Sequence, residues 1–227
     1  MSSRVHESSI TTLESAQPGE IIAFGSYPQT AVGADKTPIQ WRVLRNSDGE
    51  LFILSEYILD CKRYHGEYVD VTWRDCDLRK WLNDAFCDIA FNAAEQELIR
   101  TTLCTDNGDG CPDTEDRVFL LSTAEVRQLT DAPNENGITV SRRTIGTAFA
   151  GVRKPDGCHL YVYDKSVDKD YIVEDGEQHG CSWWWLRTQG NSPSRAHFIG
   201  THSSIRSYCR VSRVNYGVRP ALELRLH

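Results

Sequence analysis

The sequence predicts an α+β fold in one domain, built on a twisted sheet with mixed or antiparallel strands. The chain has 227 residues, of which 40% are hydrophobic and 10% aromatic, enough to bury one substantial core. Helix-like patterns occur only as far as Leu129, whereas strand-like patterns occur near both ends. Strands and helices therefore do not alternate along the chain, which argues against a doubly wound parallel sheet.

The first elements expected are strands. Residues 1–18 are polar, and we expect a flexible N-terminal segment as far as Pro18. Short apolar runs then follow, separated by Gly, Pro, Asn and Asp, which is typical of strands joined by turns. These runs are Ile21–Phe24, Ile39–Leu44 and Leu51–Leu54.

Two helices are predicted between residues 75 and 103. Asp75 can cap a helix over 76–86, in which large apolar residues recur at a spacing of three to four and share one face. A second helix is expected over 93–103, with Leu98 and Ile99 as its apolar residues.

Strand patterns dominate the second half of the chain. Ser122 and Glu125 form a capping-box pattern, which predicts a short helix ending at Leu129. Beyond this helix the chain is rich in turn-forming residues. Short strands are expected at Val118–Leu121, Leu160–Tyr163, Ser182–Leu186 and Val218–Leu224.

Composition and motifs exclude several classes of function. The formal charge of −7 argues against a general nucleic-acid binder, and no run approaches the roughly 18 apolar residues of a membrane helix. The first 20 residues lack the apolar stretch of a secretory signal, so we expect a protein that is cytoplasmic as synthesised, with virion association or surface display by another route left open. No dinucleotide-binding, P-loop, zinc-protease or hydrolase motif occurs, so neither a cofactor nor enzyme activity is expected.

The eight cysteines include no Cys-x-x-Cys pair. Buried free thiols are favoured, and the alternatives are one or two disulfides, or a zinc site drawn from Cys104, Cys111, Cys158 and His159. The acidic loop 104–116 does not fit an EF-hand, because Gly108 stands where a calcium ligand is required. We therefore interpret this loop as a solvated turn and expect no bound metal.

Three consecutive tryptophans, Trp183–Trp185, form the most conspicuous local pattern. On a strand two of the rings point one way and the third points the other way, so at least one faces a core. Packing is therefore favoured over an aromatic ligand box.

The segment from Asn191 to Tyr216 has a different composition from the rest of the chain. It contains four arginines, two histidines, two tyrosines and six serines, but no Asp or Glu. Because the segment contributes +4, the remainder of the chain carries −7 − 4 = −11. This composition is similar to that of an antibody paratope, in which Tyr and Arg anchor the partner and Ser supplies adaptable hydrogen bonds. The alternative is a polar loop that happens to be basic.

Longer motifs point to a family. Six runs between Gly19 and Leu226 carry these motifs. They are GEIIAFGSYPQT, PIQWRVL, YILDCKRY, VTWRDCDLRKWLNDAF, WWWLRTQGN and GVRPALEL. Together they resemble a bacterial and phage module that includes the variable proteins of diversity-generating retroelements, whose folds are similar to C-type lectins and formylglycine-generating enzymes. The resemblance implies a C-type lectin-like domain over 19–227, with two flanking helices, long turn-rich insertions and a variable region at about 188–220. It also implies that the first and last strands share a sheet.

The same resemblance implies a hypervariable ligand-binding, receptor-recognition protein. In such retroelements the adenines of AAC and AAT codons are randomised. Randomising the first two bases of these codons cannot produce a codon for Lys, Glu, Gln, Met or Trp. These five residue types number 34 in the 201 residues outside Asn191–Tyr216 and zero inside it. A random window of this length would lack them about 1% of the time. The composition therefore supports diversification of this segment.

Within the segment, the family pattern alternates scaffold and displayed positions. Ala196, Ile199, Ile205, Val211 and Val214 are expected to face inward. Cys209 is expected to be displayed beside the ligand-binding residues. The expected ligand-binding residues are Ser192, Ser194, Arg195, His197, Phe198, Thr201, His202, Ser204, Arg206, Ser207, Tyr208, Arg210, Ser212, Arg213, Asn215 and Tyr216.

Two departures from the family pattern are visible. Gln189 stands where the family usually has proline, and the insertion Gly151–Gly180 is long and charged. No EPN or QPD tripeptide occurs, so calcium-dependent sugar binding is not implied.

The segment Asn191–Tyr216 contains four arginines and no carboxylate. We therefore expect its partner to be a macromolecule, most simply a protein with an acidic patch.

Two other functions remain open from the sequence. One is an undiversified surface or structural module of the same fold. The other is a formylglycine-generating type of oxidase, which needs a reactive cysteine pair, and Cys181 and Cys209 are the candidates.

Overall fold

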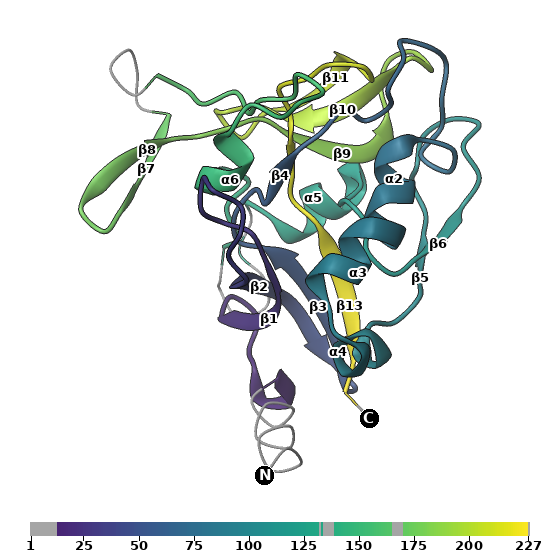
Figure 1. Cartoon of the computed structure of the whole chain (residues 1–227). Coiled ribbons are helices and arrows are strands. Elements are labelled where there is room, and N and C mark those ends of the chain that lie inside the picture. The colour runs from purple at the N-terminus through teal and green to yellow at the C-terminus, as the bar shows by residue number, and fades with distance from the viewer. Residues whose placement is uncertain (1–12, 132, 134–138, 165–169, 227) are drawn as a thin grey trace.

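Strands from both ends of the domain meet in one four-stranded antiparallel sheet, in the lower part of Figure 1. The computed structural model describes residues 13–131, 133, 139–164 and 170–226. The order of the sheet is β1-β2-β3-β13, with bounds Ile21–Tyr27, Thr37–Ser47, Glu50–Ser55 and Ala221–Arg225. The three early strands are confirmed, and the last strand shares their sheet from Ala221 onward.

A second sheet of five strands lies above the first in the same view (Figure 1). Its order is β11 (Ile205–Arg210), β10 (Arg195–Ile199), β9 (Trp184–Gln189), β12 (Gly217–Val218) and β4 (Asp60–Cys61). Strand β12 is antiparallel to β4 and parallel to β9, so this sheet is mixed. Val218, predicted in the last strand, therefore belongs to the second sheet, and the chain crosses between the sheets at Arg219 and Pro220.

The first predicted helix is longer and differently capped than expected. It runs as α2 (Asp77–Trp81), a π-helical turn η1 (Leu82–Phe86) and α3 (Cys87–Ala90). The Cys76 thiol, not Asp75, accepts the capping hydrogen bond, from the Arg79 amide at 3.4 Å. The Asp75 carboxylate instead accepts from the Thr72 hydroxyl. The π-helical turn leaves Leu82 and Phe86 buried, and α3 packs against β1.

The second predicted helix is shorter than expected. Helix α4 (Ala93–Leu98) starts with a capping box from Asn92 to Glu95 and ends where Ile99 bridges Leu224 of β13. Residues 102 and 103, predicted as helical, belong to β5 (Thr102–Cys104), which pairs with β6 (Thr114–Asp116). Strand pairing with residues outside the predicted helix overrides the local helical pattern.

The other predicted elements have mixed outcomes. Helix α5 (Thr123–Leu129) starts with the predicted capping box, and a further short helix, α6, spans Ala148–Gly151. Residues 118–121 are buried, and with the described residues they form a single bridge, between Phe119 and Ala221, in place of the expected strand. Residues 160–163 likewise contribute only the bridge from Val162 to Ser182.

A hairpin that the sequence reading missed projects from the insertion (Figure 1, left). It consists of β7 (Tyr171–Glu174) and β8 (Glu177–Gly180), joined by Asp175 and Gly176 with φ of 50° and 81°. Two adjacent residues with positive φ are the requirement of a tight two-residue hairpin turn, and Asp-Gly is a favoured sequence for it. The Asp175-Gly176 dipeptide is therefore the feature from which the sequence could have predicted this hairpin.

One hydrophobic cluster connects the two sheets. Trp41, Trp184 and Trp185 are fully buried in it, and each indole N–H donates to a backbone oxygen, so none is an unsatisfied donor. The predicted flexible segment 1–18 lies outside the described residues as far as residue 12. Leu13 and Ala16 are buried in the cluster and belong to the folded domain.

Trp184→Ala is expected to lower the free energy of unfolding by about 2–5 kcal/mol, because it leaves a cavity in this cluster. The Arg219 guanidinium, 5.2 Å from the centre of the Trp184 ring, would lose its packing partner as well. The matched control is Arg213→Ala at an exposed position, for which a cost under about 0.5 kcal/mol is expected. Ile205, expected from the sequence to face inward, is only half-buried, so Ile205→Ala is expected to cost less than Trp184→Ala. Denaturant unfolding measures all three, and equal costs at Trp184 and Arg213 would contradict the division into core and surface.

No helix in the described ranges is long and apolar enough to cross a membrane.

Candidate ligand-binding face

Strands β10 and β11 lie within the segment that the sequence singles out, and β9 ends just before it. Within β11, Arg206, Tyr208 and Arg210 are exposed and alternate with less exposed residues, as side chains on one face of a strand do. Aromatic residues from neighbouring segments lie beside them. We define the β9–β11 face as Trp183, Phe198, Tyr208, Tyr216, Arg206, Arg210 and Arg213.

Stacked aromatic rings form the floor of this face. Tyr216 stacks on Trp185, with ring centres 4.3 Å apart, and on Trp183, with ring centres 5.2 Å apart. Phe198 meets Tyr216 edge-on at 4.9 Å, and Tyr161 stacks on Trp183 at 3.9 Å. Because Trp185 is fully buried, the stack is anchored in the core and holds the outer rings in place.

Two adjoining hollows open over this floor. One, of about 230 Å³, is lined by Trp183, Phe198, Gly200, Thr201, His202, Ser204, Arg206, Tyr208 and Tyr216. The other, of about 310 Å³, is lined by Trp183, Tyr208, Cys209, Arg210, Arg213, Asn215 and Tyr216. They share Trp183, Tyr208 and Tyr216, so each combines a common aromatic floor with its own arginines.

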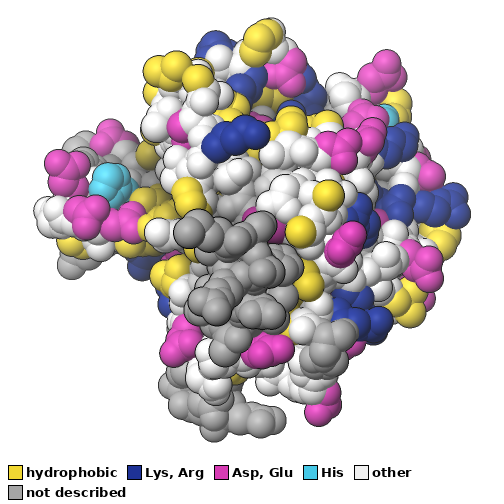
Figure 2. Space-filling view, turned by 60° about the horizontal axis from the view of Figure 1, so that its bottom comes forward, with side chains coloured by type: hydrophobic (Ala, Val, Ile, Leu, Met, Phe, Trp, Pro, Cys, Tyr) yellow, Lys and Arg dark blue, Asp and Glu magenta, His cyan; other side chains and the backbone are white. Residues whose placement is uncertain are grey.

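The arginines of the β9–β11 face have no acidic partner in the part of the chain that the structure describes. None of Arg206, Arg210 and Arg213 forms an ion pair with a carboxylate of the described residues. Arg206 donates to the Ser204 hydroxyl at 3.0 Å, and the Arg210 guanidinium lies 4.8 Å from the centre of the Tyr68 ring. By contrast, basic and acidic side chains are interspersed where the lower end of the molecule comes forward (Figure 2).

The structure sorts the predicted ligand-binding residues by exposure. Five are exposed: His202, Arg206, Tyr208, Arg210 and Arg213. Eight are half-buried: Ser192, Ser194, Arg195, His197, Ser204, Ser207, Ser212 and Asn215. Among the expected scaffold residues, Ala196, Ile199 and Val211 are buried, whereas Ile205 and Val214 are half-buried.

Four residues expected to be displayed are buried instead. Phe198, Thr201 and Tyr216 are 3%, 6% and 6% exposed, and Cys209 points to the opposite side of β11 from Tyr208. A register shift between Ala196 and Phe198 breaks the alternation in β10, and Phe198 packs against Tyr208 and Tyr216. All four still line a hollow, so they shape the face from below.

His197 is not displayed either. Its Nδ1 hydrogen-bonds with the hydroxyl of Thr123 at the start of α5, which ties β10 to that helix. Burial, together with the nearby positive charge of Arg127, lowers the pKa of His197 below its usual value. A neutral imidazole is therefore favoured, and we assign His197 to the support of the face.

The sequence reading missed three aromatic residues at the site. Trp183 was assigned to packing with its neighbours, yet it is half-buried and lines both hollows. Tyr161 covers the other side of Trp183. Tyr68 borders the arginines, and hydrogen bonds from Ser194 and Arg195 lower its pKa. Side chains alternate between the two faces of a strand, so the tryptophan triple could have indicated that Trp183 lies at the site. Tyr161 and Tyr68 come from distant loops, and the sequence contains no such signal for them.

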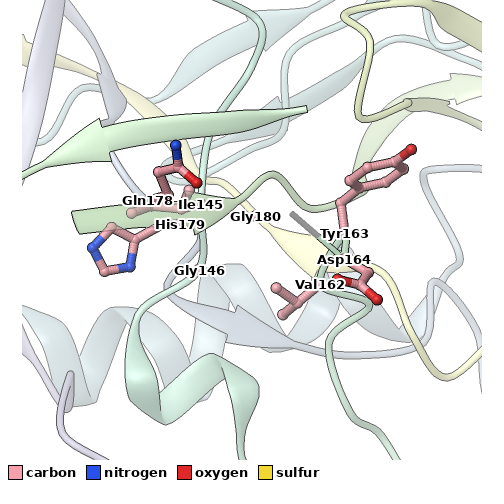
Figure 3. Close-up of a pocket in the computed structure, with 8 residues that line it drawn as sticks. All are labelled: Ile145, Gly146, Val162, Tyr163, Asp164, Gln178, His179 and Gly180. Atoms are coloured by element: carbon pink, nitrogen blue, oxygen red, sulfur yellow. The ribbon is translucent and has the colours of Figure 1, made fainter. Parts of the chain in front are cut away.

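The long insertion borders one end of the face. His202, at the first hollow, pairs with the buried Asp170 just before β7, and its ring centre is 6.0 Å from that of Tyr163. A third hollow, of about 330 Å³, lies beneath β8. Figure 3 shows Val162, Tyr163 and Asp164 across it from Gln178 and His179. None of the predicted ligand-binding residues lines this third hollow.

The acidic loop supports the face from behind. Asp106, Asp109 and Asp113 are exposed, as expected of a solvated turn, but Asn107 is 2% exposed and its amide donates to the backbone oxygens of Cys104 and Pro112. The backbone N–H of Gln189 in β9 donates to the Asn107 oxygen at 2.9 Å. A proline at this position has no N–H to donate, so the departure from the family pattern has a structural reason.

The thiols are placed for packing. All eight cysteines are free, and seven of them are buried. Burial raises the pKa of Cys209 to about 12 and also raises that of Cys181, which suppresses the nucleophilic thiolate at neutral pH. Within the described residues, no three His, Cys, Asp or Glu side chains are grouped to hold a metal ion.

A protein-family model matches most of the chain. The family model described as a domain of unknown function, DUF6273, matches residues 48–226, which is everything from β3 onward. No curated protein and no solved structure matches the chain.

Proposed function

The chain belongs to the DUF6273 family, and we propose that it is a ligand-binding protein whose recognition surface is the β9–β11 face. The observation that carries this proposal is the set of three arginines around aromatic hollows, without ion pairs to described carboxylates. Arg, Tyr and Trp are the side chains that most often dominate binding energy once an interface excludes water. The proposed partner is a macromolecule with an acidic patch, since the arginines would attract it and repel a basic one.

A ligand-binding role is also supported because different residues hold the face in place and contact solvent. The floor is anchored through Trp185 in the core, whereas Arg206, Arg210 and Arg213 make few contacts within the chain. Side chains of this kind can change without disturbing the backbone that presents them. This is the property that a diversified binding protein needs.

We further propose that a retroelement diversifies the segment 191–216, as the resemblance of the sequence implies. The expected observation is a near-copy of the coding segment for residues 188–220 beside a reverse transcriptase gene, differing from it at adenines. A locus without such a near-copy would leave an undiversified surface module as the better description.

Exchanging the exposed residues of the β9–β11 face for another set accessible from AAC and AAT codons is expected to abolish recognition. The midpoint of unfolding and the oligomeric state should change little, because the exchanged side chains lie outside the core. The measurement is capture of host-cell envelope proteins by the original and exchanged proteins. Equal capture by both would place the binding site elsewhere.

A further inference from the structure

The spacing of the arginines along β11 carries information about the partner. Arg206, Tyr208 and Arg210 occupy alternate positions on one side of a single strand. Two residues of a strand advance about 6.8 Å, so the two arginine positions are about 13–14 Å apart with the tyrosine midway. An extended peptide presents its own alternate side chains at the same interval.

The two hollows lie on either side of that tyrosine. One contains Arg206, and the other contains Arg210 and Arg213, while Trp183 and Tyr216 extend beneath both. The order along the face is therefore cationic, aromatic, cationic. A complementary ligand has an apolar group at its centre and an anionic group at each end.

A second copy of this chain does not fit the same position. Strand β11 is the outer strand of its sheet, with only β10 beside it among the described strands. Antiparallel pairing of two β11 strands centred on Tyr208 would place Arg206 of each copy opposite Arg210 of the other. Like charges directly opposite one another destabilise a strand pair, and charged edge strands resist self-association. The occupant is therefore a different chain.

We infer that the β9–β11 face recognises an extended acidic peptide segment with one large apolar side chain midway between two carboxylates four residues apart. This inference rests on the proposed function and specifies its partner. The apolar side chain would enter the hollows against Trp183 and Tyr216, and the carboxylates would meet Arg206 at one end and Arg210 with Arg213 at the other. Arginine and carboxylate can pair through two parallel hydrogen bonds, which adds geometric selectivity to the charge.

The test uses synthetic peptides as probes and fluorescence polarisation with the full chain. The first probe is Ser-Glu-Ser-Phe-Ser-Glu-Ser, and the second, Ser-Ser-Phe-Ser-Glu-Glu-Ser, has the same composition and charge but adjacent carboxylates. We expect the first to bind at least about tenfold more tightly, and we expect Arg206→Ser to remove this advantage. The matched control Lys36→Ser removes an exposed charge that lines neither hollow and should preserve it.

Several results would overturn the inference. Equal affinities of the two peptides, or no binding of either at about 1 mM, would show that the spacing along β11 does not select the ligand. Tighter binding of a sulfated oligosaccharide than of either peptide would identify a glycan as the occupant. None of these results contradicts a binding role for the face itself, which is tested separately by exchanging its residues.

Discussion

Replacing Arg187 with alanine is expected to lower the free energy of unfolding by about 3–5 kcal/mol, the largest effect on stability that we predict for a single substitution. Arg187 is fully buried, and its guanidinium pairs with both carboxylate oxygens of Glu125, at 2.6 and 2.8 Å. Its other hydrogen bonds go to the Asn107 side chain and to the backbone oxygens of Leu120 and Thr105.

The cost is large because these contacts join three parts of the chain. Arg187 lies on β9 beneath the binding face, Glu125 lies in the first turn of α5, and Asn107 lies in the acidic loop. Alanine would leave the Asn107 side-chain oxygen and the Leu120 backbone oxygen without this donor, and the Glu125 carboxylate would keep, among the described residues, only the Ser122 N–H. An unpaired buried acceptor costs more than its hydrogen bond contributes. Glu125 also completes the capping box of α5, so it has two roles.

Denaturant unfolding of Arg187→Ala and Arg206→Ala provides the comparison. Both substitutions remove one guanidinium, but the second is at an exposed position and should cost under about 0.5 kcal/mol. If Arg187→Ala fails to fold, Arg187→Lys can replace it: it keeps the charge, cannot form the paired hydrogen bonds, and should be intermediate. A cost at Arg187 no larger than at Arg206 would show that the buried network does not stabilise the domain.

Elements specified by nearby residues were predictable from the sequence. The capping box of Ser122 and Glu125 starts α5 as expected, because both partners lie within one helical turn. The apolar runs beginning at Ile21, Ile39 and Leu51 form strands that lie side by side in one sheet. In these places local preference and the final fold agree.

Features that depend on distant residues were not predictable in this way. The acidic loop looked solvated because its local composition is polar, yet Asn107 is buried through contacts with Arg187, eighty residues later in the chain. The expected helix over 93–103 ends early because Ile99 bridges β13. Neither partner can be inferred from the neighbouring sequence.

In the candidate site, too, some features were predictable from the sequence and others were not. The resemblance placed Arg206 and Arg210 on the surface, where the structure has them, but it also expected Ser207 and Cys209 to be displayed. The alternation of exposed and less exposed residues follows from the period of β11, a strand that was not predicted. The burial of Phe198 and Tyr216 follows from the register shift in β10 and from the tryptophan stack, which only the folded chain reveals. The sequence therefore assigned Phe198 and Tyr216 to display, whereas both support the hollows from below.

Removing the three arginines of the face together is expected to weaken ligand binding on the order of 100-fold. The variant Arg206→Ser, Arg210→Ser and Arg213→Ser keeps the aromatic floor and removes the positive charge at both hollows. Part of the loss should appear as slower association, because charges at the rim of an interface steer an oppositely charged partner. The effect should shrink at high salt, where these interactions are screened.

The matched control removes the same charge elsewhere. Lys36, Lys80 and Arg153 are exposed and line none of the three hollows. Changing these three residues to serine should leave affinity within about twofold of the original protein, since surface substitutions away from an interface contribute little to binding. Any loss due only to the more negative net charge would appear equally in both variants.

The dissociation constant of a captured acidic partner, measured for the original protein and for both triple variants alongside their unfolding midpoints, tests the central claim most directly. The predicted result is a loss of affinity on the order of 100-fold in the face variant alone, with unfolding midpoints that stay together. Equal affinities of the two variants, or a loss in the face variant accompanied by a matching loss of stability, would contradict the assignment of binding to the β9–β11 face.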